Sequence, residues 1–269
     1  MNIPVDLDDT ASWPPELRRI ASLGARHSGC QTRFTSDLRP SEELSRAIDL
    51  ILAEYGVVVY HCTRLMDSEV DDIRLNGLRA TSQELLADKV AAALEAGLLT
   101  HTQVECILTT GVLNAVDQRM IRTNEICTVA NRHTIEAVGY GLEPYFQNWG
   151  GEITHFWQQT GEDLELEKAL REIGKPTLIA LHHRTSERHL YFPELAKIVI
   201  GRWRNHEDYG GEIHLRVPEN ARVSVLNICQ PGDKGWPREA SNAIASMSDH
   251  AVMNLPEELA TEIAAWHRS

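Results

Sequence analysis

A short apolar run at residues 57–60, Val-Val-Val-Tyr, constrains the fold of this chain more than any other segment. Its β-branched and aromatic side chains favour a buried strand, and the run is too short to favour a helix. It leads directly into the polar residues His61, Cys62, Thr63 and Arg64. A strand of this kind delivers polar side chains to the edge of a sheet, so we expect polar groups to gather at its end.

A short helix is predicted directly after this strand. Val70 and Ile73 supply its apolar positions, and the acidic residues before them favour a helix N-terminus because negative charge is stabilised there. Asn76 and Gly77 end the helix, and Leu78 follows. The order of strand, polar tip, short helix and glycine is the strongest pattern in the chain.

The segment YHCTRL, together with Ile73 and the Gly77-Leu78 pair, resembles the opening of the ADP-ribosyltransferase fold. In that family a strand carries a histidine and a Thr or Ser, and a helix closes on Gly-Leu. The resemblance implies an α+β fold, with a split, mostly antiparallel β-sheet core flanked by helices. It also implies an enzyme that consumes NAD. A satisfied structural histidine is the alternative interpretation of His61.

The resemblance implies roles for individual residues. His61 and Glu212 are the expected catalytic residues, and His61 is also expected to hold the adenosine ribose, with Thr63 and Arg64 as further NAD-binding residues. The family places a glutamate at the start of a late strand, and the segment EIHLRVPENARVSVLNI, which begins at Glu212, is similar to that pattern. Glu152 competes for this role because it also follows two glycines, and we favour Glu212.

The reaction itself explains why a carboxylate is needed. Nicotinamide leaves NAD as a neutral molecule, so no strong general acid is required. Positive charge builds on the ribose, and a fixed carboxylate beside that ribose stabilises the charge in a partly water-excluded cleft. The remaining task of the protein is to position the dinucleotide.

The chain departs from the family in the middle of the pattern. No Ser-Thr-Ser triplet follows the predicted strand at 126–130, and Asn131 and Arg132 stand there instead. An arginine can pair with a phosphate through two hydrogen bonds, and a tyrosine such as Tyr145 can stack on the nicotinamide ring. Asn131, Arg132 and Tyr145 are therefore the further candidates for NAD binding, and the subfamily is left open.

Charge and composition exclude some function classes. The 269 residues carry a formal net charge of -13, which argues against tight nonspecific binding of nucleic acid. The five cysteines are scattered without a CxxC pair, which favours reduced thiols over a zinc or redox motif. No apolar run reaches membrane-spanning length and the N-terminus has no signal-peptide pattern, so we expect a cytoplasmic protein without a membrane partner.

The chain order predicts one catalytic domain with two appendages. Residues 1–40, which are rich in Pro and Gly, are expected to form a loosely packed arm with a short helix at 16–23. Residues 41–230 are expected to form the ADP-ribosyltransferase-like domain, with a helical insertion near 80–120. Residues 231–269 add a loop and a closing helix.

Hydrophobic periodicity predicts the other elements of the domain. Helices are expected at 42–55, 82–86, 89–96, 102–108 and 162–173, and strands at 126–130, 153–157, 177–182, 212–217 and 223–228. The segment 195–203 is compatible with either structure. We expect the last two strands to be joined by a turn at Pro218, Glu219 and Asn220.

Two alternatives to an active transferase stay open. The same fold can serve as a non-catalytic binding or regulatory module. A metal-dependent hydrolase that uses His182, His183 and His189 is less favoured, because adjacent histidines on a strand point to opposite faces, and no metal ligand is assigned. The acceptor of ADP-ribose is open as well: a protein side chain, a nucleic acid, a small molecule, or water in an NAD glycohydrolase. Membership of such a family implies a bacterial toxin or defence effector.

Overall fold

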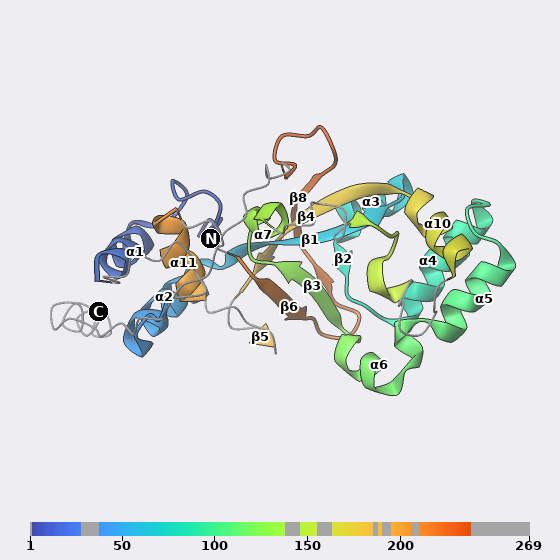
Figure 1. Cartoon of the computed structure of the whole chain (residues 1–269), viewed down its shortest axis with the longest axis horizontal. Coiled ribbons are helices and arrows are strands. Elements are labelled where there is room, and N and C mark those ends of the chain that lie inside the picture. The colour runs from blue at the N-terminus through green and yellow to red at the C-terminus, as the bar shows by residue number, and fades with distance from the viewer. Residues whose placement is uncertain are drawn as a thin grey trace.

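The computed structural model describes residues 2–27, 38–137, 146–154, 163–184, 188–189, 195–205 and 210–237. Its helices are α1 (Pro15–His27), α2 (Glu42–Tyr55), α3 (Asp67–Asn76), α4 (Gln83–Glu95), α5 (His101–Thr110), α6 (Val116–Arg122), α7 (Arg132–Ala137), α10 (Leu164–Glu172) and α11 (Leu195–Trp203), with the short 3-10 helices η2 (Val112–Asn114) and η3 (Gly151–Ile153). Its strands are β1 (Val57–Leu65), β2 (Leu78–Arg79), β3 (Glu125–Val129), β4 (Lys175–His183), β5 (Arg188–His189), β6 (Glu212–Arg216), β7 (Arg222–Val223) and β8 (Val225–Cys229). Figure 1 shows the sheet in the middle of the molecule with helices at both ends.

Six strands form one antiparallel sheet in the order β5-β6-β3-β1-β4-β8, and β2 pairs with β7 separately. β1 lies inside the sheet, where the apolar residues at 57–60 are all buried. The predicted mixture of helices with an antiparallel sheet is therefore confirmed. The predicted strand 212–217 is present as β6, which pairs with β3. The predicted strand 223–228 is divided into β7, which pairs with β2, and β8, which pairs with β4 at the other side of the main sheet.

The pairing of β1 is unequal on its two sides. All nine residues of β1 are in register with β4. On the other side, β1 and β3 share one registered pair, Tyr60 with Val129. After Tyr60, β1 continues to pair with β4 but has no further registered pair with β3. The two strands diverge there. The divergence opens a gap in the sheet at the position where the polar residues of β1 begin.

Gly56 fixes the turn that leads from α2 into β1. Its φ of 75° lies in the left-handed region, and its N–H donates to the carbonyl of Leu52. A Cβ at this position would lie 2.1 Å from His182 Nε2 and 3.0 Å from the carbonyl oxygen of His183. No larger residue fits here without a shift of its neighbours, so glycine determines where β1 begins.

The N-terminal segment packs into the core, which corrects the expectation of a loosely packed arm over 1–40. Val5 forms a parallel bridge with Val57, and the indole of Trp13 donates to the carbonyl of Asp6 at 2.8 Å. Trp13 and Leu17 are at most 1% exposed. Val5 and Leu7 are buried as well, whereas Ile3 is 78% exposed. Burial of each of these large apolar side chains stabilises the fold by about 1.5–3 kcal/mol. Residues 28–37 lie outside the described ranges.

Helices cover the two ends of the molecule. α1, α2 and α11 pack together with the sheet in the main core, at the left of Figure 1. α4, α5 and α10 surround a second core that includes Leu86, Ile107, Leu166 and Leu170, at the right of Figure 1. The helices predicted within 80–120 are therefore present as α4 and α5, and α10 completes their core.

Three other segments differ from expectation or resolve it. The predicted strand at 153–157 is wrong in its first two residues, because Ile153 belongs to η3 and Thr154 has a helical backbone conformation. Residues 155–157 lie outside the described ranges. The ambiguous segment 195–203 is the helix α11. The closing helix expected within 231–269 also lies outside the described ranges, which end at residue 237.

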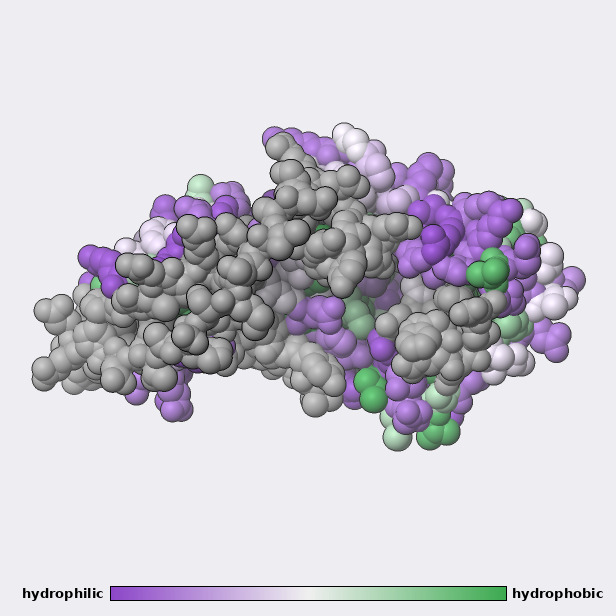
Figure 2. Space-filling view, viewed as in Figure 1, coloured by the Kyte–Doolittle hydropathy of each residue, from purple (hydrophilic) through white to green (hydrophobic). Residues whose placement is uncertain are grey.

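α6 exposes an apolar face beside the gap in the sheet. Val116, Met120 and Ile121 are 62%, 69% and 46% exposed, and hydrophobic surface is visible over this helix in Figure 2. α6 contributes no buried residue to either core. Its contacts are mainly with η2, which precedes it, and then with β3, which follows it.

Arg64 joins β1 to the segments that precede and follow α10. Its guanidinium donates to the carbonyl oxygens of Ile173 at 3.1 Å, Gly174 at 2.9 Å and Phe146 at 3.4 Å. Backbone carbonyl groups thus occupy the N–H donors of Arg64, which the sequence predicted to bind NAD. The geometry gives Arg64 a structural role in place of the expected NAD contact.

We predict that Arg64→Ala lowers the free energy of unfolding by about 1–3 kcal/mol, because it leaves carbonyl groups without their donor. The matched control is Arg74→Ala, whose side chain is 62% exposed and pairs with Asp71 at 3.7 Å. An exposed pair of this kind contributes little, so the control changes stability by less than about 1 kcal/mol. Urea unfolding followed by circular dichroism measures both, and equal values for the two variants contradict the structural role.

Candidate functional site

A cavity of about 570 Å³ lies where β1 and β3 diverge. Its walls come from β1, α3, α4, β3, β6 and the turn around η3. The volume is within the range of roughly 300–1,000 Å³ that small-molecule sites occupy. Both His61 and Glu212, the expected catalytic residues, line this cavity.

The strand register explains how residues so far apart in sequence reach one cavity. Tyr60 is paired with Val129, and Val129 is paired with Glu212, so these three positions form a row across β1, β3 and β6. His61 is the first residue of β1 beyond this row. The gap between β1 and β3 therefore opens between the histidine and the glutamate.

His61 spans the gap with its side chain. Its Nδ1 lies 2.8 Å from the carbonyl oxygen of Cys127, and burial lowers the pKa of His61 below its usual value. A neutral ring that donates from Nδ1 leaves Nε2 as an acceptor for a hydroxyl group. Such an acceptor suits the ribose contact that the resemblance implies.

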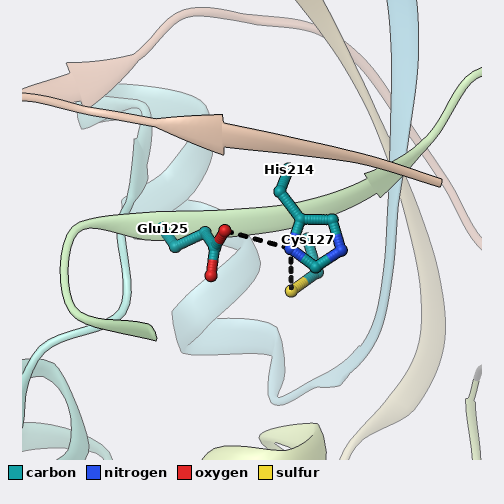
Figure 3. A group of neighbouring side chains, drawn as sticks. All are labelled: Glu125, Cys127 and His214. Carbon is teal, nitrogen blue, oxygen red and sulfur yellow. Dashed lines mark hydrogen bonds and ion pairs between the residues drawn. The ribbon is translucent and has the colours of Figure 1, made fainter. Parts of the chain in front are cut away.

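A chain of polar side chains continues from Glu212 across β6 and β3. Cys127 and His214 are directly paired, and Glu125 lies two residues before Cys127 on the same face of β3. His214 Nδ1 is 3.0 Å from Glu125 Oε1 and 3.8 Å from Cys127 Sγ, and its Nε2 is 3.9 Å from Glu212 Oε2. Figure 3 shows Glu125, Cys127 and His214 turned toward one another.

The side chains around His214 and Glu212 shift the pKa values of both groups. The contact with Cys127, followed by that with Glu212, raises the pKa of His214 to about 10. The neighbouring His214, and more weakly Arg122, holds the pKa of Glu212 below its usual value. Glu212 is thus an ionised carboxylate, and 66% of its side chain is exposed. It is charged and accessible from the cavity.

Glu69 and Lys89 also lie in the cavity wall, but they hold other elements together. Glu69 accepts hydrogen bonds from the backbone of Met66 at 2.8 Å and from the indole of Trp149 at 2.7 Å, and it pairs with Lys89. The Lys89 ammonium lies 4.6 Å from the centre of the Trp149 ring. These charges are used within the fold and are weaker candidates for ligand binding.

The other residues that the sequence singled out are distributed differently. Thr63 is buried and lines the cavity. Asn131 accepts from the backbone and hydroxyl of Thr134 and so begins α7, whereas Arg132 binds Asp8 at 3.2 Å; among the described residues neither one lines the cavity. Tyr145 lies outside the described residues.

Glu152, the competing carboxylate, is described only in its backbone. It belongs to η3, and its neighbours Gly151 and Ile153 both line the cavity. Its side chain lies outside the described residues, so the preference for Glu212 over Glu152 stays a prediction. Of the histidines considered for metal binding, His182 and His183 do not line the cavity, and the side chain of His189 also lies outside what is described.

Sequence reasoning missed Glu125 and Cys127 as site residues. Cys127 is an exposed thiol at the cavity. The alternation of apolar Ile213, Leu215 and Val217 with Glu212, His214 and Arg216 predicts that the three polar residues share a face of the strand. Glu125 and Cys127 are two residues apart on one strand and so share a face. This spacing points to a site only when β3 is known to pair with β6, because that pairing brings His214 beside them.

The chain was compared with known proteins in three ways. Protein-family models, curated proteins and solved structures give no match. Within the described part of the chain, no helix has the length and apolar character needed to cross a bilayer. The functional interpretation therefore depends on the geometry of the cavity.

We predict that Cys127 is alkylated by iodoacetamide before the other described cysteines. It is exposed, so the reagent reaches its sulfur, and the side chains of His214 and Arg122 lie 3.8 Å and 3.9 Å from that sulfur. Burial instead raises the pKa of Cys62 and Cys229. Mass spectrometry of peptides after timed alkylation measures the order, and modification of Cys62 or Cys229 before Cys127 contradicts it.

Proposed function

We propose that this chain is an NAD-consuming enzyme of the ADP-ribosyltransferase type, which cleaves the bond between nicotinamide and ribose. The observation that carries the proposal is the presence of His61 and Glu212 at one cavity, on strands that flank the gap in the sheet. The resemblance requires these two residues to act on one dinucleotide. Their shared cavity supports that requirement.

Glu212 supplies the charge that the reaction needs. Its carboxylate is exposed toward the cavity, and His214 on the same strand lies 3.9 Å away and orients it. Positive charge that builds on the ribose of NAD is stabilised by such a fixed carboxylate. Nicotinamide then departs as a neutral molecule, and ADP-ribose is captured by a nucleophile.

The dinucleotide is held by residues on both sides of the gap. His61 accepts from the adenosine ribose through Nε2, and Thr63 lies two residues further along β1 on the same cavity wall. We assign phosphate binding to Arg122, because it lines the cavity at the end of α6, whereas Arg132 does not line the cavity and binds Asp8. An arginine pairs with a phosphate through two parallel hydrogen bonds.

The acceptor and the biological setting are parts of the same proposal. Capture by water makes the enzyme an NAD glycohydrolase, whereas capture by a macromolecule or small molecule makes it a transferase. We propose a cytoplasmic site of action, which suits the free thiols of Cys62, Cys106, Cys127 and Cys229 and the cytoplasmic supply of NAD. A toxin or defence effector is the setting that the resemblance implies.

We predict that purified protein incubated with NAD releases nicotinamide, and that Glu212→Gln lowers the rate at least about 100-fold. The substitution keeps the shape of the side chain and removes its charge, and loss of one fixed electrostatic group at a transition state commonly costs about 10²–10³-fold. Liquid chromatography of nicotinamide and ADP-ribose measures the rate. The matched control is Glu219→Gln, at an exposed turn after β6, which keeps the wild-type rate.

Equal rates in the wild type and Glu212→Gln exclude Glu212 from the mechanism. Wild-type protein that binds NAD in calorimetry but releases no nicotinamide supports the non-catalytic module instead. The same assay with His61→Ala separates binding from chemistry, because loss of a ribose contact raises KM for NAD more than it lowers kcat. An unchanged KM assigns His61 to structure alone.

A further inference from the structure

We propose that Glu125, Cys127 and His214 form a binding site for a divalent transition-metal ion of the Zn²⁺ type. The three side chains project from one face of two paired strands, β3 and β6. Each offers one ligand atom, and all of these atoms lie within 4.8 Å of one another. The inference concerns a different ligand from NAD and is tested without NAD, although His214, Glu212 and Arg122 border both sites.

The spacing of the ligand atoms is close to that of a tetrahedral metal site. Bonds of roughly 2.0–2.3 Å from a metal to N, O and S ligands give separations of roughly 3.3–3.6 Å between ligand atoms. In the chain, His214 Nδ1 is 3.0 Å from Glu125 Oε1 and 3.8 Å from Cys127 Sγ. Small rotations of the side chains are therefore enough to bring the three atoms around one ion.

The carboxylate of Glu125 provides an independent reason to expect a cation. Its side chain is 5% exposed, and its Oε2 has no hydrogen-bond partner among the described residues. A buried carboxylate is costly unless it is paired or coordinates a metal. His214 contacts Oε1 of Glu125. A bound ion would supply a partner for Oε2.

The other ring nitrogen of His214 has the neighbour that a metal-bound histidine usually has. If Nδ1 binds the ion, Nε2 carries the proton and faces Glu212 Oε2 at 3.9 Å. Carboxylates in this position fix the tautomer and orientation of metal-bound histidines. The site thus contains its ligands and an outer carboxylate that orients one of them.

The ligand set selects the type of ion. One thiolate, one imidazole and one carboxylate suit Zn²⁺ and similar borderline ions, whereas Mg²⁺ and Ca²⁺ require oxygen ligands. Arg122 Nη1 lies 3.9 Å from Cys127 Sγ, and a cysteine binds a metal ion through its thiolate. Three protein ligands leave a fourth position for water or for a group bound in the cavity.

The test uses the full chain, reduced and freed of metal, with Co²⁺ and Zn²⁺ as the only added ligands. We expect about one Zn²⁺ per chain in calorimetry, and a near-ultraviolet absorption band from thiolate to cobalt with Co²⁺. Cys127→Ser abolishes this band, whereas Glu125→Gln keeps it and weakens affinity at least about tenfold. Cys106→Ser is the matched control, because Cys106 lies in α5 outside the cavity, and it leaves both signals unchanged.

A second measurement needs no variant and so does not depend on the folding of one. In the wild type, Zn²⁺ slows alkylation of Cys127 at least about tenfold and leaves the rate at Cys106 unchanged, as read from individual peptides. A cobalt band that survives Cys127→Ser, or alkylation of Cys127 that is indifferent to Zn²⁺, overturns the site. Neither outcome bears on nicotinamide release, which is measured without added metal.

Discussion

The unequal pairing of β1 is the constraint on which the rest of the structure depends. β1 is in register with β4 along its whole length but meets β3 at Tyr60 alone. Backbone N–H and C=O groups without a partner strand need another hydrogen-bond partner. The ring nitrogen Nδ1 of His61 is that partner for the carbonyl oxygen of Cys127. His61 and Thr63 line the cavity that opens beyond Tyr60, whereas Arg64 donates to backbone carbonyls outside it.

Local patterns in the sequence predicted most of the elements but not their neighbours. The runs that became β1, β3, β4 and β6 have β-branched composition or alternation that is visible without a structure. Nothing in these runs says that β6 joins β3 while β8 joins β4, since the choice of partner depends on which strand edges the whole fold leaves open. The pairing of Cys127 with His214, and with it half of the candidate site, follows from that choice.

The arginines show why individual site residues are harder to predict than strands. Arg64 and Arg132 each follow an apolar run, where an arginine that binds a phosphate is also expected. In the structure, Arg64 donates to backbone carbonyls and Arg132 binds Asp8, which is more than a hundred residues away in the chain. A guanidinium satisfies a carbonyl, a carboxylate or a phosphate with the same donors, so only the fold decides which of them it meets.

His214 connects the two proposals through its two ring nitrogens. Nδ1 faces Glu125 and Cys127, and Nε2 faces Glu212, so an ion on one side and a carboxylate on the other do not compete for the same atom. The side chain of Glu212 is 66% exposed, so the contact with His214 leaves most of the carboxylate open to the cavity. An imidazole held by an ion has less freedom to turn, and it then orients Glu212 more firmly. The part of the cavity that holds a cation and the part that stabilises a ribose are thus separated by a single side chain.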